Sequence, residues 1–361
     1  KKDYPIILAI DTSCDDTSVA VTQGMRILSN VIASQTELHR KYGGVMPLIA
    51  KLAHNDLINP TYQEALKRAR ITEDKIDAIA VTQGPGLAIA LEIGIQYAKS
   101  LAKDLNKPLI GINHMAGHMY SPLAVPKTGN PTPQTCIMPS NSKESSKQPL
   151  HSTNNTPIPI LAFLVSGGHT EIIHLCSTAK TPSLKAIKVA QTLDDAAGEA
   201  LDKFARMLDL GYPGAYVMEE LAKSGDPHKY QFPLPMTSSG DHNFSFSGIK
   251  TTGRHMIEKI TKQTIQPQHK KYQPQEIWLG GGVVNNIEFR KAISKICKGK
   301  TTFSPKINTV NSKTINLRIP YTKKLMSDNA AMIGVAAYFK YIGEELVLDF
   351  DAFQRIPRLS L

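Results

Sequence analysis

The 361-residue chain contains little cysteine, one tryptophan and no long uncharged apolar run. Its cysteines are Cys14, Cys136, Cys176 and Cys297, and no two of them form a Cys-x-x-Cys pair. They indicate neither a zinc ribbon nor a disulfide framework, so a reducing compartment fits best. No stretch of membrane-spanning length is free of charges and helix breakers, and the start of the chain shows no signal-like segment. We therefore expect a soluble protein without a membrane partner.

Acidic residues are also scarce, with 31 Asp and Glu against 42 Lys and Arg, which gives a net charge of +11. Such a balance favours a polyanionic partner such as RNA, but proteins of the mitochondrial matrix are often basic for other reasons. Both interpretations stay open at this point. A hydrophobic content of 41% and the length of the chain predict a large core divided over two domains.

Two patterns half a chain apart each predict a β-hairpin with a polar tip. Residues 6–10, 11–17 and 18–21 form the first pattern, and residues 160–165, 166–170 and 171–175 form the second. Their recurrence suggests a duplicated domain. Hydroxyls and glycines at both tips would let the backbone approach phosphate oxygens from two sides, as in a nucleotide clamp between two lobes. The alternative is a pair of ordinary hairpins that face solvent.

Strands that alternate with glycine-rich turns and helices predict an α/β fold. Residues 77–81 read as a strand that enters the Gly-Pro-Gly turn at 84–86, and a helix follows over 88–102. Such a turn at the N-terminus of a helix can bind an anion, but Gly-Pro-Gly is also a common connection between a strand and a helix without any ligand. A third glycine cluster, within 277–286, lies between a strand and a helix, where small residues would allow a purine against the backbone.

A pair of histidines is the clearest sign of chemistry in the chain. His114 and His118 follow the apolar run 109–112, and a spacing of four places both rings on one face of a helix. They could share one metal ion, or they could bond to backbone carbonyls and water. Asp328 precedes the last helix, and it is either the N-cap of that helix or the carboxylate that completes a two-His, one-Asp site.

Four further segments suggest a local structure or a binding role. Residues 194–203 indicate a helix start with its acids in the first turn, although Asp202 lies too deep for capping. The alternating Phe of 243–250 suit a strand whose Ser and Lys could face a ligand. Residues 122–157 predict a long surface insertion. The lysines between 291 and 324 are a candidate phosphate-backbone surface, or simply solvated charge.

Taken together, these motifs resemble the universal tRNA N6-adenosine threonylcarbamoyltransferase family, once called the O-sialoglycoprotein endopeptidase family. The motifs span nearly the whole chain. They are residues 10–17, 83–86, 114–118, 165–170, 194–199, 281–283 and 327–331. Residues 38–45 and His169 are similar to the bacterial and organellar branch, since archaeal and eukaryotic cytosolic members usually have Asn at the position of His169.

The resemblance implies an actin-like, sugar-kinase-like (ASKHA) fold, in which two duplicated α/β lobes enclose a nucleotide and metal cleft. We expect residues 1–113 and 335–361 to form one lobe and residues 114–334 the other, with the insertion at about 122–157 in the second. The implied reaction transfers the threonylcarbamoyl group from threonylcarbamoyl-AMP to N6 of the adenosine beside the anticodon, in tRNAs that read codons beginning with A.

The resemblance also implies the site residues and partners. His114, His118 and Asp328 would hold one divalent ion per subunit, which could be iron, zinc or manganese. The adenylate would contact Leu164, Val165, Ser166, Gly167, Gly168, Asp202, Ala215 and Asn286. Asp11, at the first hairpin tip, is our candidate to orient the attacking amine or accept its proton. Partners would be tRNA, a separate synthase that supplies threonylcarbamoyl-AMP, and a second copy of the chain.

Three departures from the family pattern are visible. Ala215 stands where the family usually has Gly, the segment between 256 and 274 is shorter and more polar than in the family, and the insertion at 122–157 is longer than bacterial members carry. Basic charge, bacterial-type motifs and the insertion at 122–157 together favour a protein of the mitochondrial matrix.

Three other functions compete with this one. A zinc metalloprotease would need a Glu directly after the first helical His, where this chain has Met115. A kinase or ATPase could use the same cleft. A non-enzymatic RNA-binding subunit would bind tRNA without modifying it.

Overall fold

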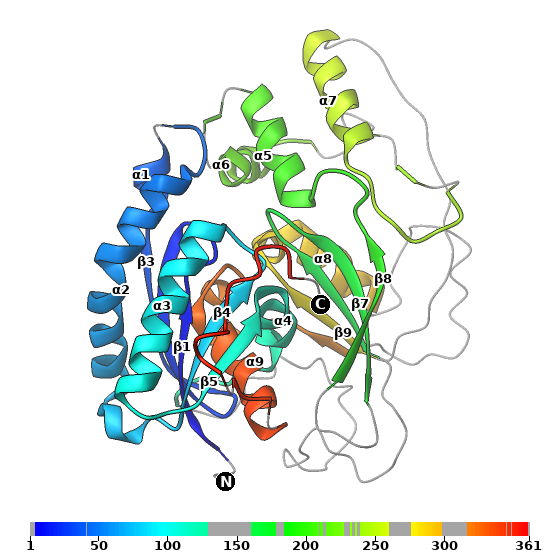
Figure 1. Cartoon of the computed structure of the whole chain (residues 1–361). Coiled ribbons are helices and arrows are strands. Elements are labelled where there is room, and N and C mark those ends of the chain that lie inside the picture. Colours follow the sequence, from blue (N-terminus) through cyan, green and yellow to red (C-terminus); the bar gives the residue numbers. More distant parts are fainter. Residues whose placement is uncertain are drawn as a thin grey trace.

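The structure is a computed structural model, and two five-stranded sheets with helices packed around them form its framework (Figure 1). It describes residues 4–40, 42–128, 160–177, 184–208, 210–211, 214–226, 232, 235–236, 239–259, 276–297, 316–343, 345–347 and 349–359. Most of the expected insertion, most of the shortened segment before 274, and the lysines between 298 and 315 lie outside the described residues.

The first sheet has the strand order β3-β2-β1-β4-β5. Its strands are β1 (Ile6–Asp11), β2 (Asp16–Gln23), β3 (Arg26–Ser34), β4 (Ala78–Gly84) and β5 (Leu109–Asn113). β1 and β2 pair antiparallel, as do β2 and β3, whereas β4 runs parallel to β1 and β5 runs parallel to β4.

The second sheet repeats this arrangement, with the order β8-β7-β6-β9-β10. Its strands are β6 (Ile160–Val165), β7 (Thr170–Ser177), β8 (Leu184–Gln191), β9 (Glu276–Gly280) and β10 (Asn316–Arg318). The antiparallel pairs again come first and the parallel pairs follow. Because the strand order and the strand directions agree between the sheets, the predicted duplication and the two-lobe α/β fold are confirmed.

Helices cover both faces of the first sheet, which explains the unbroken apolar run of β1. Leu8 and Ile10 pack in a core with α2 (Pro47–Ala69) and α3 (Ala88–Asp104). Ile7 and Ala9 point the other way, into a core with α9 (Ala330–Ile342). The short α1 (Thr36–Arg40) precedes α2.

One helix joins the two lobes. α4 (His114–Tyr120) packs against α9, β5, β6 and β9, so it touches elements of both sheets (Figure 1). Its buried Met115 and Met119 belong to a single core that also contains Ile7 of β1 and Trp278 of β9. The predicted histidine pair therefore lies at the junction of the lobes.

The remaining helices belong to the second half of the chain. They are α5 (Ala197–Met207), α6 (Gly214–Ala222), α7 (Ser247–Lys259) and α8 (Ile287–Cys297), and a 3₁₀ turn, η4 (Gly282–Asn285), precedes α8. Among the described residues, no helix combines the length and the apolar character needed to cross a bilayer. The limits of the two lobes stay a prediction.

One local prediction was wrong, and another was only partly right. The strand expected over 243–250 is absent, because Phe244 makes only an isolated bridge with Thr192 and α7 begins at Ser247. Alternating Phe indicates strand periodicity, but the backbone of the described part of this segment pairs with the chain at the end of β8 only at Phe244 before α7 begins. The helix expected to start within 194–203 is present as α5, which begins at Ala197 and has Glu199 in its first turn, whereas Asp194 and Asp195 lie before that turn.

Candidate active site

The turn from β5 into α4 fixes the positions of the two histidines. The side-chain oxygen of Asn113 caps the helix by accepting hydrogen bonds from the backbone N–H groups of Met115 (2.8 Å) and Ala116 (3.2 Å). His114 and His118 then lie one turn apart, 7% and 0% exposed. Their ring centroids are 4.7 Å apart and the rings meet edge to face. The prediction that both rings share one face of a helix is confirmed.

Asp328 completes the group. Its Oδ1 lies 3.1 Å from Nε2 of His118 and 3.4 Å from Nε2 of His114. The three potential ligand atoms all lie within 4.8 Å of one another. Asn329, not Asp328, is the N-cap of α9, since its side chain accepts a hydrogen bond from Met332 N–H at 3.1 Å. Capping therefore does not explain Asp328.

The first hairpin tip reaches His114 from the other side. Ser13 Oγ lies 3.1 Å from Nδ1 of His114, and Asp11 Oδ2 lies 3.7 Å from the same nitrogen. Asp11 is itself held in place, because its Oδ1 accepts a hydrogen bond from Ser13 N–H at 3.1 Å. Nδ1 of His114 thus faces Ser13 and Asp11, which leaves Nε2 directed toward Asp328. Metal-binding histidines commonly have this division between an ion and an orienting partner.

The electrostatics of the group favour a cation. Burial lowers the pKa of His114, but the carboxylates of Asp328 and Asp11 outweigh burial and raise that pKa to about 10. Burial raises the pKa of Asp328, yet His114 and His118 hold it well below its ordinary value. A field that binds a proton this strongly also attracts a divalent ion, which competes with the proton for the same nitrogens. Two imidazole nitrogens and one carboxylate oxygen therefore fit a divalent metal.

The second hairpin tip is built against the start of α5 and the third glycine cluster. Ser166 O and Gly167 O accept hydrogen bonds from the N–H groups of Gly198 and Glu199, both at 3.1 Å. A Cβ on Gly281 would lie 2.5 Å from the carbonyl oxygen of Val165, and one on Gly280 would lie 2.2 Å from that of His118. The structure thus brings the tip, α5, the glycine cluster and α4 together.

The other residues predicted to contact the adenylate lie on α5 (Asp202), at the start of α6 (Ala215) and directly after η4 (Asn286). Asp202 on α5 accepts a hydrogen bond from Ala215 N–H at 2.9 Å, and Asn286 accepts one from Phe289 N–H at 2.9 Å at the start of α8. α5 also contacts η4, directly before Asn286. The Leu164 side chain is 0% exposed and lies in the core, so only its backbone is available to a ligand. Adenylate contact by these residues stays a prediction.

The ligand role suggested for the Ser and Lys residues of 243–250 has a simpler explanation. Asp194 accepts hydrogen bonds from Ser245 Oγ at 2.5 Å and from Phe246 N–H at 2.7 Å. Burial raises the pKa of Asp194, but these hydrogen bonds prevail and lower it to about 2. Lys250 pairs with Asp195 at 2.5 Å. These side chains fasten the segment to the start of α5.

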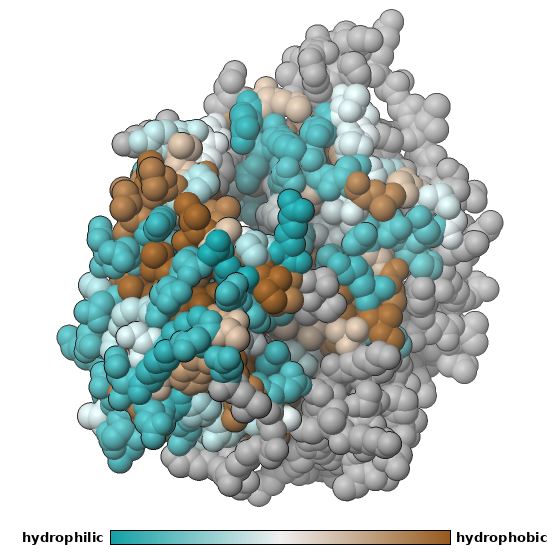
Figure 2. Space-filling model, viewed as in Figure 1, coloured by the Kyte–Doolittle hydropathy of each residue, from teal (hydrophilic) through white to brown (hydrophobic). Residues whose placement is uncertain are grey.

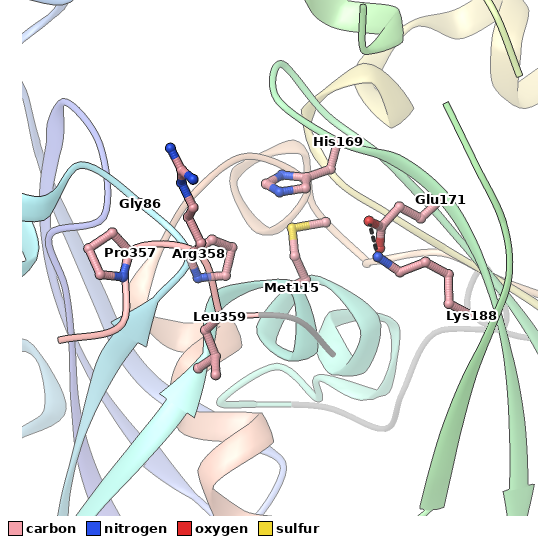
Figure 3. A pocket seen from close by; sticks show the side chains of 9 residues that line it. Gly86, Met115, His169, Glu171, Lys188, Pro357, Arg358 and Leu359 are labelled. Carbon is pink, nitrogen blue, oxygen red and sulfur yellow. Dashed lines mark hydrogen bonds and ion pairs between the residues drawn. The ribbon is translucent and has the colours of Figure 1, made fainter. Parts of the chain in front are cut away.

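Sequence reasoning missed the C-terminal segment. A cavity of about 360 Å³ opens beside α4 (Figure 3), and its lining residues are Pro85, Gly86, Met115, His169, Glu171, Lys188, Pro357, Arg358 and Leu359. The segment is held by hydrogen bonds from Ile356 N–H to Gln83 O (2.7 Å) and from Gly86 N–H to Pro357 O (3.2 Å). The Gly-Pro-Gly turn thus accommodates this segment, since a Cβ on Gly84 would lie 1.8 Å from Ile356 O.

One carboxylate near the hairpin tip is held at a cost to stability. Asp16 begins β2, and its buried Oδ1 has no hydrogen-bond partner among the described residues. Burial, together with Asp15, Asp328 and Asp11, raises its pKa from 3.8 to about 6, although Ser34 acts in the opposite direction. Since the folded state disfavours the charged form, stability falls as the pH rises from about 4 to about 6.

The variant Asp16→Asn removes this charge without changing the shape of the side chain. We expect it to raise the free energy of unfolding at pH 8 by about 1–3 kcal/mol, and to leave it nearly unchanged at pH 4. Urea unfolding of both proteins at the two pH values measures the difference. An equal difference at pH 4 and pH 8 would contradict the assignment.

Comparisons with known proteins agree on one family. The sequence profile described as tRNA N6-adenosine threonylcarbamoyltransferase matches residues 26–144 and 146–335. A protein of that name from Thermosipho melanesiensis is 38% identical, over 99% of this chain and 100% of its own length. Another, from Clostridium botulinum, is 37% identical over 98% of this chain and 97% of its own length.

Proposed function

Because the chain belongs to the tRNA N6-adenosine threonylcarbamoyltransferase family, we propose that His114, His118 and Asp328 hold a divalent metal ion where the threonylcarbamoyl group is transferred. The chain is a tRNA-modifying acyltransferase, and its product is the N6-threonylcarbamoylated adenosine of tRNA. The convergence of two Nε2 atoms on Asp328 Oδ1 carries the proposal. A divalent ion bound there would act as a Lewis acid toward the carbamoyl oxygen and offset nearby negative charge.

The donor in this proposal is threonylcarbamoyl-AMP, made by a separate synthase, and its adenylate lies along the second hairpin tip. Support comes from the open backbone of that tip. Gly167 and Gly168 are exposed, and apart from their chain neighbours no atom of a described residue lies within 4 Å of where their Cβ atoms would be. The half-buried Gly282 in η4 has the same open space at its Cβ position. Backbone N–H groups in such glycine-rich turns can approach phosphate oxygens closely, while Asp202 and Asn286 offer acceptors nearby.

The side chains around His114 have a positioning role in this scheme. The N6 amine attacks the carbamoyl carbon, the bond to AMP breaks, and the amine gives up one proton. Asp11 is 2% exposed, and its pKa is lowered because His114 outweighs the effect of burial. Both properties suit a carboxylate that orients His114 better than one that accepts a proton. Proton acceptance by Asp11 stays a prediction.

The protease alternative lacks its general base. The residue after His114 is Met115, which is 3% exposed and belongs to the core. No acid lies between His114 and His118 on α4. The acids that reach the histidines, Asp11 and Asp328, contact the ring nitrogens themselves. These contacts favour the transferase over a metalloprotease.

A homodimer is part of the proposal, and an apolar surface supports it. Hydrophobic side chains gather over α1 and the beginning of α2, at the upper left of Figure 2. The exposed members are Leu38, Tyr42, Met46, Leu48 and Leu52. Exposed apolar patches of this kind commonly mark protein interfaces. A second copy of the chain would cover this patch. We also propose the mitochondrial matrix as its location, which microscopy of the tagged full-length protein can check.

Metal binding is tested first with the purified apo protein. We expect one zinc ion per chain in a calorimetric titration, and a loss of affinity of at least about 100-fold in His118→Ala because a direct ligand is removed. His242→Ala is the control, since His242 lies outside the cluster. Unchanged zinc affinity in a folded His118→Ala protein would sink the metal assignment.

Transfer activity is tested with threonylcarbamoyl-AMP and a tRNA that reads a codon beginning with A. Asp328→Ala should abolish product, and Ser13→Ala should lower the rate about 10–100-fold because His114 loses its orienting partner. Ser224→Ala is the matched control, because within the part of the chain that the structure describes the Ser224 hydroxyl donates only to Leu221 O on α6. Full activity of Asp328→Ala would exclude a role for the cluster, and an inactive natural chain would point to a missing partner.

The dimer is tested by sedimentation at micromolar concentration. We expect the natural chain to sediment as a dimer, and the double variant Leu48→Glu with Leu52→Glu as a monomer, because charges are placed in the buried interface. Leu221→Glu, an equally exposed position on α6, should remain dimeric. A natural chain that is monomeric, or a double variant that still dimerises, would rule out this surface.

A further inference from the structure

A group of buried polar side chains lies where α1 and α2 meet the first hairpin, apart from the metal cluster and the predicted adenylate contacts. Its members are Thr17 on β2, Gln35 directly before α1, His39 on α1 and His54 on α2, and none of these residues is more than 1% exposed. Both helices lie at the left of Figure 1, where α2 packs on β2 and β3. Because buried imidazoles and amides are costly unless their polar atoms have partners, the group requires an explanation.

A backbone donor fixes the outer half of this hydrogen-bond network. Met46 N–H donates to Nδ1 of His39 at 3.3 Å. Since a ring nitrogen that accepts carries no proton, the proton of this ring is on Nε2, which donates to Gln35 Oε1 at 3.4 Å. The Gln35 amide nitrogen is therefore directed at Thr17 Oγ1 (3.3 Å) and at Nδ1 of His54 (3.2 Å). The Thr17 hydroxyl in turn donates to the same Nδ1 at 2.8 Å.

A backbone acceptor fixes the inner half. The carbonyl of Cys14 can only accept, so Nε2 of His54, 3.0 Å away, is the donor. Nδ1 of His54 is then free to accept from the Gln35 amide. Burial lowers the pKa of His54, although the Cys14 carbonyl and the carboxylates of Asp11 and Asp15 act in the opposite direction. A neutral ring is what this arrangement of donors and acceptors requires.

The network has a single direction because it starts at a backbone N–H and ends at a backbone carbonyl. A proton on Nδ1 of either ring would face an N–H donor, so one tautomer of each histidine satisfies all of these bonds. Gln35 also donates its backbone N–H to Asp15 O at 3.1 Å, so the carbonyls of two successive tip residues, 14 and 15, are held. Buried polar networks that are fully satisfied make the segments they contact rigid.

The segment held in this way is the one that orients the metal ligand His114. Ser13 directly precedes Cys14, and its Oγ lies 3.1 Å from Nδ1 of His114. The Ser13 N–H donates to Asp11 Oδ1 at 3.1 Å, and the Ser13 carbonyl accepts a hydrogen bond from Leu87 N–H at 2.8 Å, at the start of α3. The tip is thus fixed by α3 at Ser13 and by the network at Cys14.

We propose that His54 is a positioning residue of the transfer reaction. Its Nε2–H holds the Cys14 carbonyl, and this bond aims the Ser13 hydroxyl at Nδ1 of His114. His54 lies outside the metal cluster, so its loss acts on the geometry of His114 and lowers the rate of transfer without weakening substrate binding. The inference rests on the proposed role of His114 in the transfer.

Two substitutions of similar polarity separate a held carbonyl from a filled core. The amide nitrogen of glutamine reaches close to where Nε2 of histidine lies, so His54→Gln keeps a donor for Cys14 O, whereas the shorter side chain in His54→Asn does not reach it. Tyr62→Phe is the control. Tyr62 is also on α2 and is 2% exposed, and its hydroxyl donates to Glu73, away from the tip. Urea unfolding establishes that all three variants fold.

The readouts are kcat, the KM values for threonylcarbamoyl-AMP and for tRNA, and the ring-nitrogen NMR signals of His114 in the zinc-loaded protein. We expect His54→Asn to lower kcat at least about tenfold, to leave both KM values within about twofold, and to shift the His114 signals. His54→Gln should recover most of the rate and the natural signals, and Tyr62→Phe should resemble the natural chain.

Equal losses in His54→Asn and His54→Gln would overturn the proposal, because the donor to Cys14 O would then not be what matters. An unaltered kcat in a folded His54→Asn protein would overturn it as well, as would His114 signals that this substitution leaves in place. No transfer by the natural chain would instead contradict the proposed function, and the His114 signals would still decide the role of His54.

Discussion

The imidazole of His114 is the element on which the site depends. Its Nδ1 is held by Ser13 and Asp11 from the first hairpin, and its Nε2 is directed at Asp328 before α9. One buried ring thereby connects three segments that lie far apart in the sequence. Buried carboxylates around it would be costly if left uncompensated, and the positive charge drawn to the ring and its neighbours offsets that cost. The same arrangement fixes the direction in which the ring can bind an ion.

Duplication explains why the chemistry gathers at this place. The first hairpin of each sheet has a polar tip. Both tips face the junction where α4 packs against α9, β6 and β9. Small residues make the close approach possible, since Gly280 and Gly281 lie against the backbones of His118 and Val165. The C-terminal segment then returns to this junction and contributes Arg358 to the cavity beside it.

The sequence predicts most of the framework because its signals are local. Apolar strands, polar tips and the spacing of His114 and His118 each depend on a few neighbouring residues. The role of Asp328 could not be read from its neighbours in the sequence. Asn329 caps α9 instead, and Asp328 contacts the rings of His114 and His118, which lie more than 200 positions away. The C-terminal segment was missed for a similar reason, because its contacts with the 83–86 turn involve no periodic pattern. The strand predicted over 243–250 was wrong because the alternating Phe residues have the periodicity of a strand, but Phe244 forms only an isolated bridge.

The most direct test of this account is X-ray absorption spectroscopy of the protein loaded with one zinc ion per chain. The account predicts a first coordination shell that contains two imidazole nitrogens and a carboxylate oxygen, and the loss of one imidazole in His114→Ala. A shell made only of oxygen atoms, or a spectrum that the His114→Ala substitution leaves unchanged, would contradict it.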